Sequence, residues 1–373
     1  MNLFVIAAPY QILNSIEAIQ RMRLASNALV VLDTGLFQRH TYERMIDKEA
    51  WQSVQFVPFK YRLTDHDFGK SFPSNLYERV LELYLVLDQM LKRWRINRLC
   101  ASVGYAEKLF LGNYMNDYDL HMRHIANGIP HERLFLLDVG TDTLRIARQR
   151  LQEQNDKSSN AFAEKRSKQV SEPSTGSWIT KFKRTVRDRF VNWTVGGVPS
   201  LTFFTCYEPE IHPSDEVIVN DYRCLQNRIQ NVRRVNVVFF VGQPLVDQQY
   251  VRLETFVRHM QRIVDYFSGR KLVYIPHPRE SERYVQLVQT ELGLPMQRFA
   301  VPIEYAITLG EEAPRGVASF FSSALVNLAS MLGNNVELTA FYIPQEDLLK
   351  QVDVVEHTYQ QIRSVKGENI KVA

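Results

Sequence analysis

Short apolar runs alternate with segments of helical periodicity along the first part of the chain, up to Gly140. Strands are predicted where apolar residues run together, at 2–8, 27–35, 54–59, 97–104 and 133–140. Between them, Ile12, Ile16 and Ile19 recur at helical spacing, and 75–96 carries apolar residues close to one face of a long helix. Strands that alternate with helices are typical of a parallel sheet covered on both faces, so the pattern predicts the α/β class.

The alternation stops after Gly140 and begins again in the second half of the chain. Residues 151–177 are polar and rich in Ser, Gln, Lys and Glu, a composition without core-forming power. Strands are predicted again at 235–245 and 271–278, and 316–332 contains a strand followed by the start of a helix. A chain of 373 residues has room for two domains. We therefore predict an N-terminal domain over 1–212, with a polar insertion at about 151–177, and a C-terminal domain over 213–373.

Residues 178–193 are a basic segment with apolar residues at every fourth position. Trp178, Phe182, Val186 and Phe190 would lie along one side of a helix, and the segment holds five basic residues and one acidic residue. Such a helix either packs on the protein with a solvated basic face, or lies on an anionic membrane surface.

The composition excludes several classes of function. The chain has 45 basic and 41 acidic residues, and this small excess does not favour a nucleic acid as partner. Its three cysteines are far apart, which argues against a disulfide scaffold and a structural zinc site. The N-terminus lacks the basic region of a signal peptide, and no apolar run approaches the ~18 residues of a membrane helix. We therefore expect a cytoplasmic protein.

The stretch KLVYIPHPRE places a histidine between two prolines at the end of a predicted strand. Pro276 and Pro278 restrict the backbone on either side of His277. Open α/β sheets bind ligands at the carboxyl ends of their strands, where an imidazole can donate a hydrogen bond to a phosphate. A plain surface histidine in a strand-ending loop is the alternative interpretation.

Two further stretches have the same ambiguity. Ser322 and Ser323 follow an aromatic run and precede a helical pattern, so they either cap a helix or present hydroxyls and backbone N–H groups to an anion. Asp138 ends a buried strand before Gly140, where a carboxylate either caps the turn or acts as a general base toward a hydroxyl. Asp142 is close enough to share or take this role.

Weaker signals come from two other turns. Glu304 follows an apolar run, and a carboxylate in that position can accept hydrogen bonds from both ribose hydroxyls of a nucleotide. Gly242 and Gln243 lie at a strand-to-helix turn, where the backbone can approach a phosphate closely.

In their order along the chain, these stretches resemble the bacterial sialyltransferases of the two-domain GT-B type. That group includes lipooligosaccharide sialyltransferases, capsule polysialyltransferases and marine-type multifunctional sialyltransferases, which carry an acidic–acidic–Gly motif, a His-Pro motif, a glutamate and a serine pair. Here Asp138 and Gly140 match the first motif, His277 and Pro278 the second, Glu304 the third, and Ser322 and Ser323 the last. Residues 7–19 also resemble the N-terminal strand, loop and helix of the family, with Gln11 near the cleft.

The resemblance implies two Rossmann-like domains that face a central cleft, the first binding the acceptor and the second a CMP-activated sugar. It implies an inverting, metal-independent transfer of sialic acid or a related nonulosonic acid to a bacterial surface glycan or glycolipid, in lipooligosaccharide or capsule. His277 would donate to the phosphate, the serines would share its charge, and Asp138 would deprotonate the acceptor. No cofactor is implied, because the leaving CMP carries one phosphate, whose charge His277 and the serines would share in place of a metal ion.

One position departs from the family pattern, because Val139 stands where a second acid is usual. The base is therefore Asp138 or Asp142. Two alternatives also remain: a GT-B glycosyltransferase that uses CMP-Kdo or a UDP-sugar, and a non-catalytic surface-glycan assembly protein with the same fold. If residues 178–193 lie on a membrane rather than on the protein, they would give it a peripheral contact with an anionic inner membrane.

Overall fold

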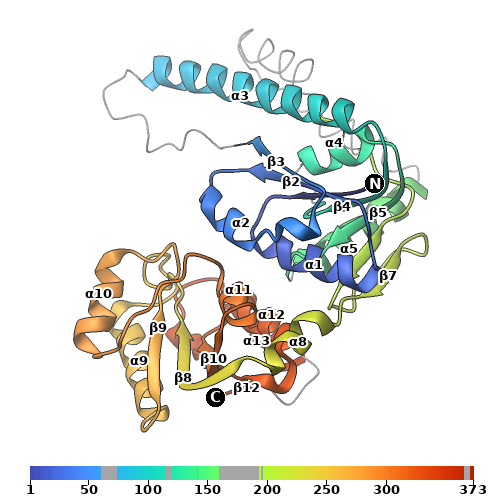
Figure 1. Ribbon diagram of the computed structural model, residues 1–373. Helices are drawn as coiled ribbons and strands as arrows, with labels where there is room; N and C mark the ends of the chain where they lie inside the picture. The colour runs from blue at the N-terminus through green and yellow to red at the C-terminus, as the bar shows by residue number, and fades with distance from the viewer. Residues whose placement is uncertain (60–73, 115–119, 141, 159–192, 195, 365–369) are drawn as a thin grey trace. The chain divides into compact units, whose positions relative to one another are not determined.

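The computed structural model describes residues 1–59, 74–114, 120–140, 142–158, 193–194, 196–364 and 370–373. Within these residues the chain forms two compact units, Met1–Asn220 and Asp221–Ala373. Each unit is built around one parallel β-sheet with helices on both faces (Figure 1).

The sheet of the first unit has seven strands in the order β3-β2-β1-β4-β5-β6-β7, and all neighbouring strands are parallel. The strands are β1 (Asn2–Ile6), β2 (Asn27–Asp33), β3 (Ser53–Pro58), β4 (Ala106–Leu111), β5 (His131–Leu137), β6 (Thr202–Thr205) and β7 (Glu216–Val219). The α-helices are α1 (Tyr10–Met22), α2 (Arg39–Met45), α3 (Ser74–Val103), α4 (Leu120–Gly128) and α5 (Asp142–Ser158).

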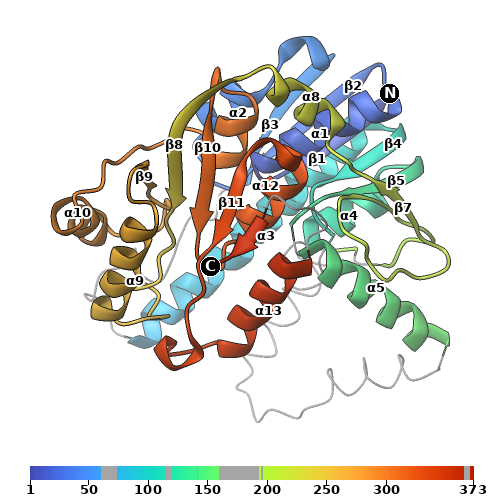
Figure 2. The same ribbon diagram turned by 90° about the horizontal axis from the view of Figure 1, so that it is seen from below.

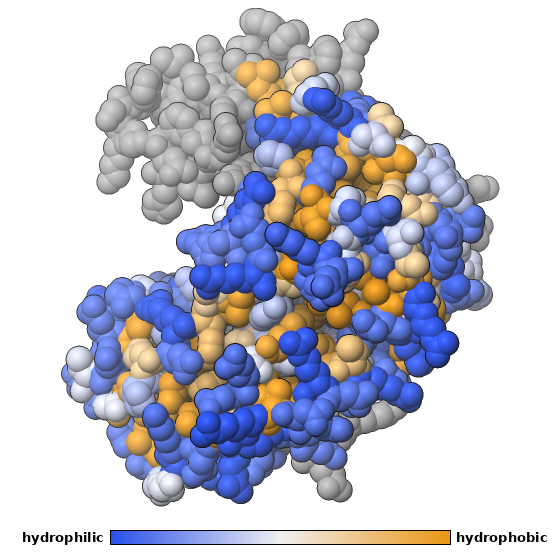
Figure 3. Space-filling view, viewed as in Figure 1, coloured by the Kyte–Doolittle hydropathy of each residue, from blue (hydrophilic) through white to orange (hydrophobic). Residues whose placement is uncertain are grey.

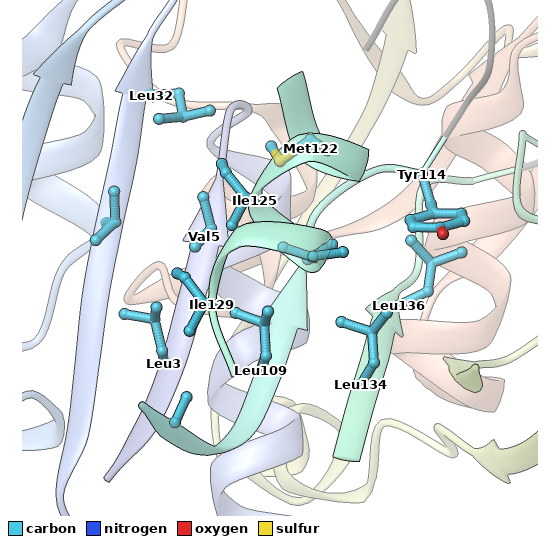
Figure 4. Packing of buried hydrophobic residues seen from close by; sticks show 14 of the residues in the cluster. Leu3, Val5, Leu32, Leu109, Tyr114, Met122, Ile125, Ile129, Leu134 and Leu136 are labelled. Atoms are coloured by element: carbon cyan, nitrogen blue, oxygen red, sulfur yellow. The ribbon is translucent and has the colours of Figure 1, made fainter. Parts of the chain in front are cut away.

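Both faces of this sheet are buried. On one face the core includes Val5 and Leu109 from the strands together with Met122 and Ile125 from α4, whose side chains point toward the sheet in Figure 4. On the other face the rings of neighbouring strands stack, with centroids 4.1 Å apart for Phe4 and Phe110, and 4.5 Å apart for Phe110 and Phe135. Burial on both faces explains why the strands appear in the sequence as continuous apolar runs.

The fourth strand was predicted at 97–104, and this prediction is wrong. Those residues form the last turns of α3, and the strand is β4, which begins at Ala106. Ile96, Leu99 and Cys100 are buried while Asn97 and Arg98 are exposed, which is the spacing of a helix with one buried side. The short strands β6 and β7 were not predicted.

The sheet of the second unit has five parallel strands in the order β12-β11-β10-β8-β9. The strands are β8 (Arg233–Val241), β9 (Lys271–Ile275), β10 (Glu312–Ser319), β11 (Glu337–Ala340) and β12 (Ile370–Val372). The helices are α8 (Arg223–Gln230), α9 (Leu253–Tyr266), α10 (Glu282–Glu291), α11 (Ile303–Thr308), α12 (Ser323–Leu332) and α13 (Val352–Ser364).

Figure 2 shows β8, β10 and β11 side by side in this sheet. On one face, Phe256, Met260 and Ile263 of α9 belong to the same core as Phe240 and Tyr274 of the strands. Helices α8, α11, α12 and α13 pack against one another as a separate layer. The face seen in Figure 3 is mostly hydrophilic, with apolar residues visible between the polar ones in both units.

Two parallel sheets covered by helices confirm the predicted α/β class with two Rossmann-like halves. The assignment of 1–212 to acceptor binding and 213–373 to donor binding stays a prediction. The predicted insertion at 151–177 begins within α5, and the rest of it, together with 178–192, lies outside the described residues. In the part of the chain that the structure describes, no helix is long and apolar enough to cross a membrane.

Candidate active site

The second unit has the topology that creates a ligand crevice in a parallel sheet. After β8 the chain passes to β9 on one side, and it later returns to form β10 on the other side of β8. The strand order therefore reverses between β8 and β10. In open α/β sheets such a switch point, at the carboxyl ends of the strands, is where ligands bind.

The predicted turn at Gly242 and Gln243 lies at this switch point. The side-chain N–H of Gln243 donates to the carbonyl of Phe321, at 3.3 Å, which joins the ends of β8 and β10. The buried hydroxyl of Ser319 donates to the carbonyl of Val241 at 2.7 Å, and so fixes the same junction two residues earlier. The two strand ends are therefore held together by the side chains of Ser319, the last residue of β10, and Gln243, two residues after β8.

The serine pair begins the helix that follows β10. Ser322 is the N-cap of α12, and its Oγ accepts the backbone N–H of Ala324 at 3.3 Å. Ser323 is the first residue of the helix. The cap uses the hydroxyl of Ser322 as an acceptor, which leaves its hydrogen able to donate to an anion. Helix capping and anion binding, which the sequence presented as alternatives, are thus compatible at Ser322.

His277 follows β9 in a loop that fixes the protonation of its ring. Pro276 is buried, His277 is half-buried, and Pro278 is exposed. The Nδ1 atom of His277 lies 3.0 Å from the backbone nitrogen of Arg279 and accepts its N–H. Nδ1 must therefore be unprotonated, and the hydrogen of the neutral ring lies on Nε2. Burial, and then the charge of Arg279, lower the pKa of His277, which favours this neutral form.

The same loop is also held by Glu280, a residue that no sequence motif indicated. The Oε2 atom of Glu280 accepts the backbone N–H of His277 at 2.5 Å, and Oε1 accepts the hydroxyl of Tyr274 at 2.6 Å. Gly242 lies against this pair, because a Cβ at that position would come within 2.5 Å of Glu280 Oε2 and of the Tyr274 hydroxyl. Only glycine allows the β8 turn to approach the carboxylate so closely.

Glu304 lies in the first turn of α11 rather than at the strand end or turn that was predicted. Its side chain is buried, and it is hydrogen-bonded to Asn327 of α12. Burial raises the pKa of Glu304, while this hydrogen bond and one within its own backbone oppose the rise. The Asn327 contact fixes Glu304 to the same helix that Ser322 caps.

In the first unit the strand order reverses between β1 and β4, and Gln11 fills that position. Its Oε1 accepts the backbone N–H groups of Ala7 and Ala8, at 2.8 and 3.1 Å, and its Nε2 donates to the carbonyl of Gly112 at 2.6 Å. Gln11 is only 3% exposed, so its amide ties the end of β1 to the end of β4.

Asp138 directly follows β5, as predicted, and is completely buried. Its Oδ1 accepts the hydroxyls of Thr143 and Thr205, at 2.7 and 2.9 Å, and its Oδ2 accepts the backbone N–H of Cys206 at 3.0 Å. Burial raises the pKa of Asp138, and these hydrogen bonds oppose the rise. The carboxyl group therefore joins β5, β6 and the start of α5.

Asp142 is in a different environment a few residues later. Gly140 turns the chain with a φ of 67°, in the left-handed region that glycine adopts readily, and α5 begins at Asp142. The Asp142 side chain is 52% exposed, and its Oδ1 lies 3.4 Å from Nε of Arg145. Of the two candidate carboxylates, Asp142 is the one that solvent reaches.

The structure thus divides the predicted residues between the two units, and all of them except Glu304 follow the carboxyl end of a strand or begin the next helix. The second unit holds Gly242, Gln243, His277, Pro278, Glu304, Ser322 and Ser323. The first unit holds Gln11, Asp138, Gly140 and Asp142. Among the described residues, no group of three or more His, Cys, Asp or Glu side chains is arranged to hold a metal ion.

Comparison with known proteins agrees with this arrangement. Residues 201–339 match the model of the alpha-2,8-polysialyltransferase (POLYST) family. That segment includes Gly242, His277, Glu304 and Ser322. Among curated protein sequences, none matches the chain significantly.

Several solved structures share the chain trace at low sequence identity. E. coli heptosyltransferase WaaC with ADP has a TM-score of 0.43 and 10% identity, over 100% of this chain and 93% of that one. The Methanocaldococcus jannaschii UDP-GlcNAc 2-epimerase in complex with UDP-GlcNAc and UDP has a TM-score of 0.48 and 9% identity, over 100% and 89%. Acinetobacter baumannii MurG has a TM-score of 0.40 and 8% identity, over 100% and 85%.

The two parallel sheets define a GT-B-type fold, and the family that matches residues 201–339 is one of glycosyltransferases. More specifically, residues 201–339 carry an alpha-2,8-polysialyltransferase family domain. The resemblance found in the sequence is therefore confirmed.

Proposed function

We propose that the protein transfers sialic acid or a related nonulosonic acid from its CMP-activated donor to a hydroxyl of a bacterial surface glycan, with inversion at the anomeric carbon. The polysialyltransferase-family domain supports this donor and a glycan or glycolipid acceptor. The observation that carries the proposal is that His277 follows β9 while Ser322 and the start of α12 follow β10, the two strands on either side of β8 in one sheet. These groups suit a single phosphate.

The leaving phosphate is the group that these residues stabilise. The bond between the anomeric carbon and the phosphate oxygen breaks, and CMP leaves with the electron pair. The Nε2–H of neutral His277 donates to a phosphate oxygen, and the Ser322 hydroxyl and the N-terminal amides of α12 share the developing charge. CMP carries one phosphate, so these donors can stabilise it without a metal ion, and metal independence is part of the proposal.

The nucleoside is bound by the remaining residues of the second unit. The carboxylate of Glu304 accepts hydrogen bonds from the ribose hydroxyls, and its contact with Asn327 supports this role because it fixes the side chain before the donor arrives. Gly242, Gln243 and Pro278 line the approach to the phosphate.

The base that deprotonates the acceptor hydroxyl is a carboxylate of the turn after β5. The exposure of Asp142 supports its assignment, because an acceptor can reach it. The raised pKa of Asp138 supports that residue instead, because a stronger base accepts a proton more readily. If Asp142 is the base, Asp138 holds the turn that carries it through Thr143.

The donor can be tested with the purified protein. Incubation with CMP-sialic acid should release CMP, whereas UDP-sugars should give no UDP. Release of UDP, or of CMP from CMP-Kdo alone, would favour another GT-B transferase. No turnover of any donor, with or without a glycan acceptor, would favour the non-catalytic alternative that Val139 keeps open. Release of UDP, release of CMP from CMP-Kdo alone, and the absence of turnover would each contradict the proposal.

A cytoplasmic location and a peripheral contact of 178–193 with an anionic inner membrane are further parts of the proposal. The basic and apolar pattern of that segment supports the contact. It would bring the enzyme to acceptors carried on lipid.

A further inference from the structure

The carboxyl group of Glu280 has contacts that the proposed donor chemistry does not use. It accepts the backbone N–H of His277 and the hydroxyl of Tyr274, at 2.5 and 2.6 Å. The backbone N–H of Glu280 itself donates to the carbonyl of His277 at 3.0 Å, which closes the turn. Glu280 therefore holds His277 through the backbone, while Arg279 holds the ring through Nδ1.

The same carboxyl group also lies against the end of the neighbouring strand, β8. Gly242 lies so close that a Cβ there would collide with Glu280 Oε2, and its N–H donates to the carbonyl of Ile275 at 2.9 Å. The turn at Gly242 continues into Gln243, which is bonded to the loop before Ser322. A change at Glu280 would therefore reach both loops that we assign to the phosphate.

Several charged groups surround this carboxyl group. Asp247, in the loop after β8, accepts the backbone N–H of Ser281 at 3.0 Å, and its charge opposes ionisation of Glu280. The charge of Arg298 favours ionisation of Glu280. The neutral ring of His277 and the charged side chain of Arg279 lie in the same loop as Glu280. Burial is the largest influence, and together these effects raise the pKa of Glu280 to about 7.

We propose that Glu280 is a positioning residue. It sets the location of His277 because one carboxylate oxygen accepts the backbone N–H of His277 while the other accepts the hydroxyl of Tyr274. This inference rests on the proposed function, because it assigns Glu280 a role only through His277. An ionised carboxylate accepts from both donors at once, whereas a protonated one offers fewer acceptor sites. Because small displacements of a catalytic group cost about 10²-fold in rate, the loop must be held firmly.

The test compares Glu280→Gln, which keeps the size of the side chain, with His277→Ala and the double variant. Glu291→Gln, at the exposed end of α10, is the matched control for the same chemical change. Each variant is assayed for CMP release from CMP-sialic acid, for CMP affinity, and for the ¹⁵N signals of the His277 ring.

We expect Glu280→Gln to lower kcat by roughly 10- to 10²-fold. CMP affinity should change little, and the His277 ring should lose its single tautomer. The double variant should be no slower than His277→Ala, because Glu280 acts through that ring. Tyr274→Phe removes one of the two donors and should show a smaller loss with the same coupling, which keeps the test decisive if Glu280→Gln does not fold.

The outcomes separate this inference from the proposed function. Wild-type turnover in Glu280→Gln together with slow turnover in His277→Ala would overturn the positioning role alone. Losses that add in the double variant would overturn it as well. Wild-type turnover in His277→Ala would instead overturn the proposed function.

Discussion

The imidazole of His277 is defined by the backbone around it more than by other side chains. One backbone amide fixes its tautomer, a second is held by Glu280, and the two flanking prolines restrict the chain. A neutral ring with its hydrogen on Nε2 is a hydrogen-bond donor over a wide range of pH, since burial lowers its pKa. This environment suits a group that stabilises charge without itself becoming charged.

Replacement of His277 by alanine should lower turnover by about 10²-fold or more, because the donor to the leaving phosphate is lost. The fold should remain, since the side chain is only half-buried at a strand end. His357→Ala, at an exposed position of α13, is the control. Initial rates of CMP release and thermal melting of both variants test this expectation, and an unchanged rate in His277→Ala would refute it.

The two aspartates after β5 should separate stability from catalysis. Asp138→Asn places an amide where three donors converge, and should lower the free energy of unfolding by about 1–3 kcal/mol. If Asp142 is the base, Asp142→Asn should keep the stability and lower turnover by about 10²-fold or more. Denaturant unfolding and initial rates measure the two effects. Full activity in Asp142→Asn would transfer the role of base to Asp138.

The pKa of Glu280 gives a pH dependence of stability with a definite sign. The folded protein raises this pKa from 4.5 to about 7, so it retains a proton that the unfolded chain loses first. This contribution to stability is present below pH 4.5 and is lost as the pH rises through about 7. Glu280→Gln cannot lose a proton, so its stability relative to wild type should rise by roughly 1–3 kcal/mol across that interval. Urea unfolding at several pH values tests this, and a constant difference would contradict it.

Strand ends were the elements most accessible to prediction. His277, Gly242, Ser322 and Asp138 were found because a buried parallel strand is a short apolar run, and the polar residue after it is visible locally. The contact of Gln11 with Gly112 joins residues far apart in the chain, so no local pattern indicates it. Glu280 was missed although it is close to His277, because its role depends on Tyr274 and Gly242 as well.

Helix and strand were confused where an apolar run was short. The run around Leu99 and Cys100 has buried residues at helical spacing, but within a few positions this cannot be distinguished from a strand. Glu304 was misplaced for the same reason, since α11 is a helix of only six residues.

The segment at 178–193, which lies mostly outside the described residues, has its own test. Exchange of Lys181, Lys183, Arg184 and Arg187 for glutamine should weaken attachment to vesicles that contain anionic lipid, by about 1 kcal/mol for each charge removed near the surface. Co-sedimentation at low and moderate salt measures this. If the parent protein does not sediment with such vesicles, the segment is not a membrane contact.

At the scale of the whole molecule, we expect the nucleotide to bind to the second unit and not to the first. CMP at about 100 times its Kd should stabilise the protein by about 2.7 kcal/mol. Amide exchange should slow at 242–243, 276–281 and 322–324, where the strand ends of the second sheet converge. Unchanged exchange at those loops, with slower exchange near Asp138 instead, would place the nucleotide on the other unit.

Two sheets of similar topology would ordinarily provide two crevices in which a nucleotide could lodge. In the first unit the amide of Gln11 already occupies that gap, saturating the backbone groups to which a phosphate or base would otherwise bond. Equilibrium titration should therefore count one CMP per polypeptide. Exchange of Gln11 for alanine would not create a second usable pocket, because the loss of its amide would also remove the link between the ends of β1 and β4.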